Sequence, residues 1–189
     1  MAVDLRQQKQ ELRQEMKRRR AVLNEQNPDA ARQLSQNFLQ NVKIPSNSII
    51  GCYIKFDSEI DPKPLAMALR AAGHIIALPI VTGKDQPLIF RQYDANDDLD
   101  VGALGTMEPR ESAPVVVPDI VLVPLLAFDA SRYRLGYGGG YFDRTINLIA
   151  RAKPVHTIGL AYANQLVPAI PHGKFDIRLD RIVTENQIF

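Results

Sequence analysis

The sequence predicts an α/β fold, with a mixed and mostly parallel sheet flanked by helices. Short apolar segments typical of buried strands alternate along the chain with amphipathic helical patterns. Over residues 49–80 a strand, a helix and a strand follow one another with short links, which is the pattern of a βαβ unit. The length of 189 residues suits one domain, so we expect residues 1–189 to form a single unit.

The amino-acid composition excludes or disfavours several classes of protein. Charged residues make up 23% and hydrophobic residues 46%, proportions that indicate a globular chain and disfavour a disordered one. A single cysteine, Cys52, excludes a disulfide scaffold and a multi-cysteine zinc site. No apolar run approaches the ~20 residues that span a bilayer, and the first residues lack the apolar core of a signal peptide. We therefore expect a cytoplasmic protein that does not enter a membrane.

The first element is a basic helix, predicted over about residues 4–24. Leu5, Leu12, Met16 and Leu23 are spaced so that they share one apolar stripe. Five cations form a second stripe beside it: Arg6, Lys9, Arg13, Lys17 and Arg20. Residues 1–20 carry seven basic and three acidic groups, whereas the rest of the chain has a net charge of −2. This asymmetry indicates an anionic ligand for the head of the chain, although a solvated amphipathic helix has the same pattern.

Proline, glycine and capping residues, together with apolar patterns, predict the remaining elements. Helices are expected after Asn27-Pro28 and after Asp61-Pro62, where proline follows a capping residue, and Gly73 ends the second of these helices. Residues 94–114 are acidic and rich in glycine and proline breaks, which predicts that they are mostly loop. The pattern predicts strands at 49–54, 75–80, 88–93, 120–123, 156–160 and 181–184, a helix at 143–150 and a short helix at 164–170.

The stretch Arg134–Arg144, RLGYGGGYFDR, is the most informative segment for function. Its four glycines lie between a predicted strand and a predicted helix, where backbone N–H groups and the helix dipole favour a phosphate. Arg134 and Arg144 flank the loop and are expected to grip phosphate oxygens as a fork. Asp143 supplies a hard oxygen ligand for Mg²⁺. The spacing matches no standard phosphate-loop motif, so a plain tight turn stays an alternative.

Other polar residues are less specific. Glu59 follows the strand at 49–54 and is suited to accept hydrogen bonds from a heterocycle, but it is equally a plain loop acid. Asp180 is expected either to complete a metal shell with Asp143 or to form a surface ion pair. The histidines lack metal-ligand spacing, and no nucleophile–base pair is evident. The residues therefore favour positioning and electrostatic stabilisation of a phosphoryl group over covalent catalysis.

The segment Val123–Arg144, VPLLAFDASRYRLGYGGGYFDR, resembles the 5-formyltetrahydrofolate cyclo-ligase family, also called methenyltetrahydrofolate synthetases. The VPxxAFD segment and the following glycine-rich segment occur in the family's order and at its spacing. The resemblance extends to the basic segment Lys9–Arg20, to Ile54–Ile60 and to the C-terminal Phe175–Glu185. It therefore covers nearly the whole chain.

The resemblance implies an ATP- and Mg²⁺-dependent ligase that converts 5-formyltetrahydrofolate to 5,10-methenyltetrahydrofolate and releases ADP and phosphate. It also implies the fold shared with ribose-5-phosphate isomerase and the CoA transferases. In the family the formyl oxygen attacks the γ-phosphate, and the folate's side-chain amine then attacks the phosphorylated carbon to close the ring. The small-molecule partners would be ATP and folate, with no nucleic acid, and we expect a monomer.

The resemblance also implies residue roles. Arg144 and Tyr141 would be catalytic, and Asp143 and Asp180 would hold Mg²⁺. ATP would be bound by Lys9, Arg13, Arg134, Leu135, Gly136, Tyr137, Gly138, Gly139, Gly140, Tyr141 and Phe142. The folate would be bound by Ile54, Glu59, Tyr137, Gly138, Gly139, Gly140 and Tyr141, with Glu59 bonded to the donor edge of the pterin.

Three positions depart from the family pattern. Phe142 stands where tyrosine is frequent, so any role of that hydroxyl is lost. Tyr137 replaces a basic or small residue within the glycine run, and Phe175 precedes Asp176 where histidine is frequent. None of the three changes removes a phosphate or metal ligand.

Two other functions fit parts of the sequence. The basic head would suit an anion-binding module for nucleic acid, although the remainder of the chain is net acidic. The glycine loop alone would also suit a sugar-phosphate isomerase or a CoA transferase that uses no ATP, with Glu59 as the one candidate nucleophile. Activity without any nucleotide would distinguish these enzymes from a cyclo-ligase.

Overall fold

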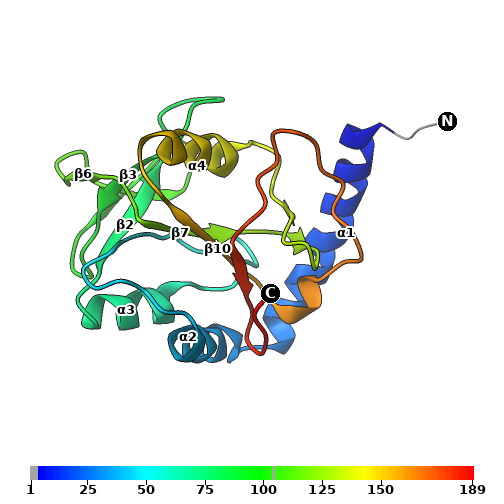
Figure 1. Cartoon of the computed structure of the whole chain (residues 1–189), viewed down its shortest axis with the longest axis horizontal. Helices are drawn as coiled ribbons and strands as arrows, with labels where there is room; N and C mark the ends of the chain where they lie inside the picture. The colour runs from blue at the N-terminus through cyan, green and yellow to red at the C-terminus, as the bar shows by residue number, and fades with distance from the viewer. Residues whose placement is uncertain (1–3, 104) are drawn as a thin grey trace.

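A seven-stranded sheet forms the centre of the computed structural model, which describes residues 4–103 and 105–189 (Figure 1). The strand order is β11-β10-β7-β1-β2-β3-β6. These strands are β1 Ile49–Gly51, β2 Ile75–Ile80, β3 Ile89–Gln92, β6 Val115–Val116, β7 Ile120–Pro124, β10 His156–Leu160 and β11 Arg181–Val183. Neighbouring strands from β11 to β2 are parallel, whereas β3 pairs antiparallel with β2 and with β6. The predicted mixed, mostly parallel sheet is confirmed.

Helices cover both faces of this sheet. Helices α2 (Ala30–Asn41) and α3 (Lys63–Ala71) lie on one face, and α4 (Tyr141–Ala152) lies on the other (Figure 1). The alternation of β7 explains this arrangement, because Ile120 and Leu122 pack in the cluster under α2 and α3 while Val121 and Val123 pack under α4. The predicted βαβ unit is present as β1, α3 and β2, with β1 and β2 parallel.

Helix α1 (Leu5–Gln26) lies beside the sheet rather than on a face (Figure 1). Met16 is fully buried there and packs against Leu126, Leu135 and Ile170. This cluster includes the small hairpin of β8 (Ala127–Phe128) and β9 (Arg134–Leu135) and neighbours the turn η1 (Ala163–Gln165). The contact carries the basic side chains of α1 toward the carboxyl ends of the sheet strands.

Several boundaries differ from the sequence prediction. The strand predicted at 49–54 leaves the sheet after Gly51, because the chain turns outward at the carboxyl edge. Residues 94–114 are mostly loop, as predicted, but they also contain the hairpin of β4 (Leu99–Val101) and β5 (Met107–Pro109). The buried Glu108 carboxylate fixes that hairpin by accepting a hydrogen bond from the Val81 N–H. The short helix expected at 164–170 is reduced to η1, and α2 begins at Ala30 rather than directly after Asn27-Pro28.

Among the described residues, no helix combines the length and the apolar character that a membrane crossing requires. The longest helix, α1, carries its cationic stripe through most of its length.

Candidate active site

A cavity of about 470 Å³ opens at the carboxyl ends of β1, β2 and β7. In parallel sheets this edge is where ligands bind. The walls come from α1, from the segment after β1, from the β4–β5 hairpin and from the glycine-rich loop that leads into α4. The lining residues are Lys9, Arg13, Tyr53, Ile54, Phe56, Glu59, Pro79, Val81, Leu88, Thr106, Met107, Pro124, Arg134–Asp143 and Asp176. All sequence-predicted site residues therefore line one cavity except Arg144 and Asp180.

The glycine-rich loop presents its backbone to this cavity. Gly138 has φ +106° and Gly140 has φ +65°, a left-handed conformation that residues with a Cβ rarely adopt. Gly140 is the N-cap of α4, and no side chain among the described residues caps the free N–H groups of the first turn. Those groups and the helix dipole form a site for an anion at the cavity wall.

Two cations of α1 approach the same loop. The Arg13 Nε–H donates to the Gly136 carbonyl at 2.9 Å, and its guanidinium lies against Gly138. Lys9 lies one turn earlier and donates to both carboxylate oxygens of Asp176 at 2.7 Å. Burial lowers the pKa of Arg13, but a guanidinium starts so high that it stays charged at neutral pH. The positive stripe on α1 therefore reaches the cavity at Lys9 and Arg13.

Asp176, which the sequence did not assign to the metal, is the second carboxylate of the cavity. Burial alone would raise its pKa, but the hydrogen bonds from Lys9 and the Gly173 N–H bring the Asp176 pKa below its usual value. Asp143 lies nearby on the same wall, where its Oδ1 accepts from the Ile177 N–H at 3.1 Å. Both acids therefore line the cavity, and each carboxylate accepts a hydrogen bond from a backbone N–H.

Asp180 does not fit the metal role that the sequence predicted for it. Its carboxylate accepts hydrogen bonds from the backbone N–H and hydroxyl of Thr157, near the start of β10. Thr157 is in register with Val121, three residues before the cavity-lining Pro124 on β7, a distance of about 10 Å along the strand. Asp180 thus fastens β11 to β10 near the amino ends of the strands, away from the cavity.

The predicted arginine fork is not formed. Arg134 is buried and pairs with Asp143 at 3.0 Å while it donates to the Ile177 carbonyl. Arg144 lies outside the cavity wall, donates to the Gly139 carbonyl at 2.5 Å and stacks its guanidinium over the Tyr141 ring. Arg134 therefore orients an acid, and Arg144 holds the shape of the glycine loop.

The part of the cavity around Glu59, its second end, combines this carboxylate with the Phe56 and Tyr137 rings. Glu59 is only 4% exposed, and its Oε2 accepts from the Phe56 N–H at 3.0 Å. Burial raises the pKa of Glu59 to about 7, against the opposing effects of that hydrogen bond and of the Arg20 charge. The Phe56 ring is half exposed and meets the Tyr137 ring edge to face, with centroids 6.0 Å apart. This end therefore offers a carboxylate and an aromatic edge to a flat ligand with hydrogen-bond donors.

Glu59 also makes stability depend on pH. The carboxyl group holds its proton more tightly in the folded chain than in the unfolded chain, so the folded state loses stability as the pH rises from about 4.5 through 7. Glu59→Gln removes this dependence. We expect the variant to gain on the order of 3 kcal/mol relative to the parent between pH 5 and pH 8, as measured by urea unfolding at both values. An unchanged difference between the two proteins would contradict the buried, weakly acidic state of Glu59.

Comparisons with known proteins point to one family. The family model for the 5-formyltetrahydrofolate cyclo-ligase family matches residues 5–185. The 5-formyltetrahydrofolate cyclo-ligase of Escherichia coli K12 is 30% identical over 177 residues, which cover 91% of this chain and 97% of the relative. The corresponding protein of Haemophilus influenzae is 31% identical and covers 92% of this chain and 95% of its own length.

A solved structure gives the same result in three dimensions. The NMR structure of Aquifex aeolicus 5,10-methenyltetrahydrofolate synthetase superposes with a TM-score of 0.79 at 28% identity, covering 95% of this chain and 91% of that one. Sequence match and fold both extend through the elements that build the cavity, from α1 to β11. This chain therefore belongs to the 5-formyltetrahydrofolate cyclo-ligase family.

Proposed function

We propose that this chain uses ATP and Mg²⁺ to convert 5-formyltetrahydrofolate to 5,10-methenyltetrahydrofolate, with release of ADP and phosphate. The observation that carries the proposal is the division of one cavity into two ends. Cations and free backbone N–H groups gather at the glycine loop, and Glu59 lies at the second end with the Phe56 and Tyr137 rings. The first end suits a triphosphate, and the second suits a pterin.

At the loop end, Lys9 and Arg13 would neutralise the triphosphate while the N–H groups of the first turn of α4 receive its oxygens. The arrangement requires Lys9 to exchange some of its contact with Asp176 for phosphate. Tyr137 to Tyr141 would separate the two substrates, and Leu135 and Phe142 would pack beside the nucleotide. These roles are supported by the position of each residue on the cavity wall.

The acids at this end fit a magnesium ion. Among the described residues there is no cluster of three or more metal-ligating side chains, but Mg²⁺ on a nucleotide commonly uses only one or two carboxylates with phosphate oxygens and water. Asp143 and Asp176 are hard oxygen donors with further lone pairs free for a ligand. When bound, the ion would neutralise charge on the phosphates. We propose Asp143 and Asp176 as its ligands, in place of Asp143 and Asp180.

At the folate end, the Glu59 carboxylate would accept two hydrogen bonds from the donor edge of the pterin, and Ile54 would pack on the ring. The formyl oxygen would then attack the γ-phosphorus, and the bond from that phosphorus to ADP breaks. The side-chain amine of the folate next attacks the formyl carbon, loses its proton and expels phosphate, which carries the formyl oxygen away. The apolar walls around Leu88, Met107 and Pro124 would keep water from the phosphorylated intermediate.

The experiment that tests the proposal follows the methenyl chromophore during incubation of the purified chain with 5-formyltetrahydrofolate and Mg²⁺. Absorbance should rise only when ATP is added. A rise without ATP would overturn the proposal in favour of a nucleotide-independent enzyme, and no rise in either sample would show that the substrate is a different one. The cytoplasmic location, the monomeric state and the lack of nucleic-acid partners stay predictions.

A glycine substitution tests the nucleotide end separately. In Gly138→Val the side chain enters a left-handed backbone position, and its Cβ would lie 3.2 Å from the Arg13 guanidinium. We expect ATP affinity, measured by calorimetry, to fall by roughly tenfold or more, because moving Arg13 costs about one charged hydrogen bond. Gly73→Val is the matched control, since Gly73 also has positive φ but open space around it. Equal ATP affinities in both variants would contradict the assignment of the loop.

A further inference from the structure

Arg20 is the most deeply buried charge in the described chain, and the roles proposed so far do not use it. It lies on α1, has no solvent exposure and belongs to no wall of the cavity. Full burial of an arginine is costly unless its donors are paired. The groups that contact the guanidinium therefore have to compensate for its lost hydration.

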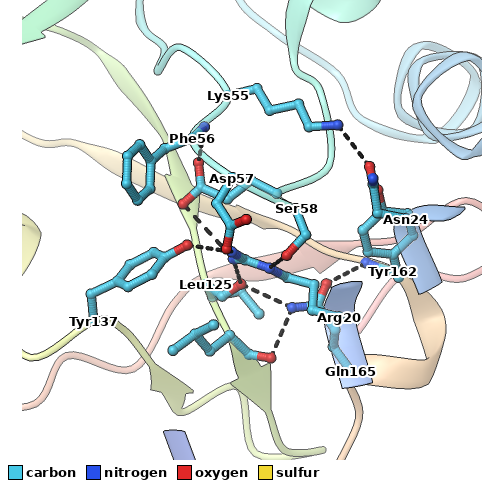
Figure 2. Close-up of polar contacts among 12 residues, drawn as sticks. Arg20, Asn24, Lys55, Phe56, Asp57, Ser58, Leu125, Tyr137, Tyr162 and Gln165 are labelled. Carbon is cyan, nitrogen blue, oxygen red and sulfur yellow. Dashed lines mark hydrogen bonds and ion pairs between the residues drawn. The ribbon is translucent and has the colours of Figure 1, made fainter. Parts of the chain in front are cut away.

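The guanidinium of Arg20 joins three separate segments (Figure 2). Its Nε–H donates to the Ser58 hydroxyl at 3.1 Å, and its Nη1–H donates to the Leu125 carbonyl at 3.2 Å. Its Nη2–H donates to the Tyr137 hydroxyl. The Leu125 carbonyl is itself fixed by a hydrogen bond from the Gln165 side chain. Figure 2 shows these partners converging on Arg20 from the segment after β1, from the end of β7 and from the glycine loop.

The same group faces the acid of the folate end. Arg20 Nη1 lies 3.8 Å from Glu59 Oε1, and Nη2 lies 3.7 Å from Asp57 Oδ2. Asp57 is 57% exposed and is screened by water, whereas Glu59 is buried, so the pair with Glu59 is the stronger electrostatic contact. Arg20 also makes a second contact with Tyr137. It is a cation–π interaction, in which the guanidinium lies 5.3 Å from the centre of the Tyr137 ring.

We propose that Arg20 is a positioning residue that sets the Glu59 carboxylate and the Tyr137 hydroxyl at fixed places relative to each other. It would thereby hold the folate end and the glycine loop of the cavity in one geometry. The inference rests on the proposed function, because it assigns a purpose to this geometry in the binding of the pterin. The anchors are the Ser58 hydroxyl and the Leu125 carbonyl, which accept hydrogen bonds from the guanidinium and do not line the cavity.

The charge of Arg20 also stabilises the ionised form of Glu59. The groups that face Glu59 are Arg20 and the Phe56 N–H, which lower its pKa, Asp57, which raises it, and the hydroxyls of Tyr53 and Tyr137. Removing the guanidinium would raise the pKa of Glu59 further above neutrality. At pH 7 the acid would then be protonated in most molecules and would donate where the pterin requires an acceptor.

The test compares Arg20→Gln with Arg18→Gln, a surface arginine on the same helix. Carbon NMR of labelled glutamate reports the titration of Glu59 in the free protein, and calorimetry reports the affinity for 5-formyltetrahydrofolate without ATP. We expect Arg20→Gln to move the Glu59 titration upward by about one unit and to weaken binding about tenfold at pH 7, with the difference narrowing at pH 9. Arg18→Gln should match the parent protein.

A purely structural role for Arg20 makes a different prediction. It would leave the Glu59 titration unchanged in folded Arg20→Gln and reduce affinity equally at pH 7 and pH 9, and either result overturns the proposal. If Arg20→Gln does not fold, Arg20→Lys replaces it, because lysine keeps the positive charge but not the forked guanidinium. In Arg20→Lys the Glu59 titration should stay near that of the parent protein. The affinity for 5-formyltetrahydrofolate should fall several-fold at every pH. Parental affinity in Arg20→Lys would overturn it. If the parent protein binds no 5-formyltetrahydrofolate, the proposed function is refuted but the role of Arg20 is not. The NMR titration then still reports whether the charge of Arg20 acts on Glu59.

Discussion

Asp143→Ala should reduce turnover by about two to three orders of magnitude while the chain stays folded, because a group aimed at developing charge is typically worth about 3–4 kcal/mol. The Asp143 carboxylate lies on the cavity wall at the start of α4, where we place the phosphates and the magnesium ion. The loss should be partly recovered at high Mg²⁺ concentration. Steady-state kinetics across a Mg²⁺ series measures both effects.

Further variants of Asp143, Asp176 and Asp180 supply the controls for this prediction. Asp143→Asn keeps an oxygen that can accept from the Ile177 N–H and from Arg134, so it removes the charge while both hydrogen bonds stay possible. Asp176→Ala should share the increased Mg²⁺ requirement. Asp180→Ala should leave that requirement unchanged and lower stability instead, because Asp180 bonds Thr157. A normal Mg²⁺ response in Asp143→Ala, or a raised requirement in Asp180→Ala, would contradict the proposed metal site.

Glu59→Gln should raise the KM for 5-formyltetrahydrofolate by roughly tenfold to a hundredfold, with a smaller effect on kcat. A carboxylate accepts two hydrogen bonds from a donor edge, whereas an amide offers one acceptor and one competing donor. Hydrogen bonds to a charged group are each worth about 1.5–3 kcal/mol. Initial rates at saturating ATP measure the two constants.

The pH profile gives this prediction a second readout. Because burial raises the pKa of Glu59 to about 7, affinity for the folate should increase as the pH rises through neutrality, and Glu59→Gln should abolish that increase. Glu25→Gln, on the surface of α1, is the matched control and should behave as the parent. A parental KM or a parental pH profile in Glu59→Gln would show that Glu59 does not bind the substrate.

The sheet was predictable because its strands have a simple physical signature. The continuous apolar segment at Ile120–Val123 is buried on both faces, so alternate residues enter different core clusters, and its sequence shows this without tertiary information. The β4–β5 hairpin was not predictable by the same means. Its stability depends on the Glu108 carboxylate bonded to the distant Val81, and the local sequence is acidic and broken by glycine.

The site residues also fall into some that the sequence could predict and some that it could not. The glycine loop and the cationic stripe could be predicted because charge and backbone freedom are properties of the residues themselves, and the family resemblance then selected Lys9 and Arg13 from that stripe. Arg20 could not be distinguished from the other cations of its stripe, such as Arg6 and Lys17, since its burial depends on contacts with Ser58 and Leu125 that lie far along the chain. Asp176 and Asp180 are equally acidic in sequence, and only the path of the chain brings Asp176 to Lys9.

In the proposed reaction the formyl oxygen receives the γ-phosphoryl group of ATP and leaves with the phosphate. The decisive experiment turns over 5-formyltetrahydrofolate labelled with ¹⁸O in the formyl group, with ATP and Mg²⁺, and analyses the phosphate by mass spectrometry. We expect one ¹⁸O atom in each phosphate released. Unlabelled phosphate, formed in step with the methenyl product, would show that the oxygen leaves by another route and would contradict the proposed phosphorylation.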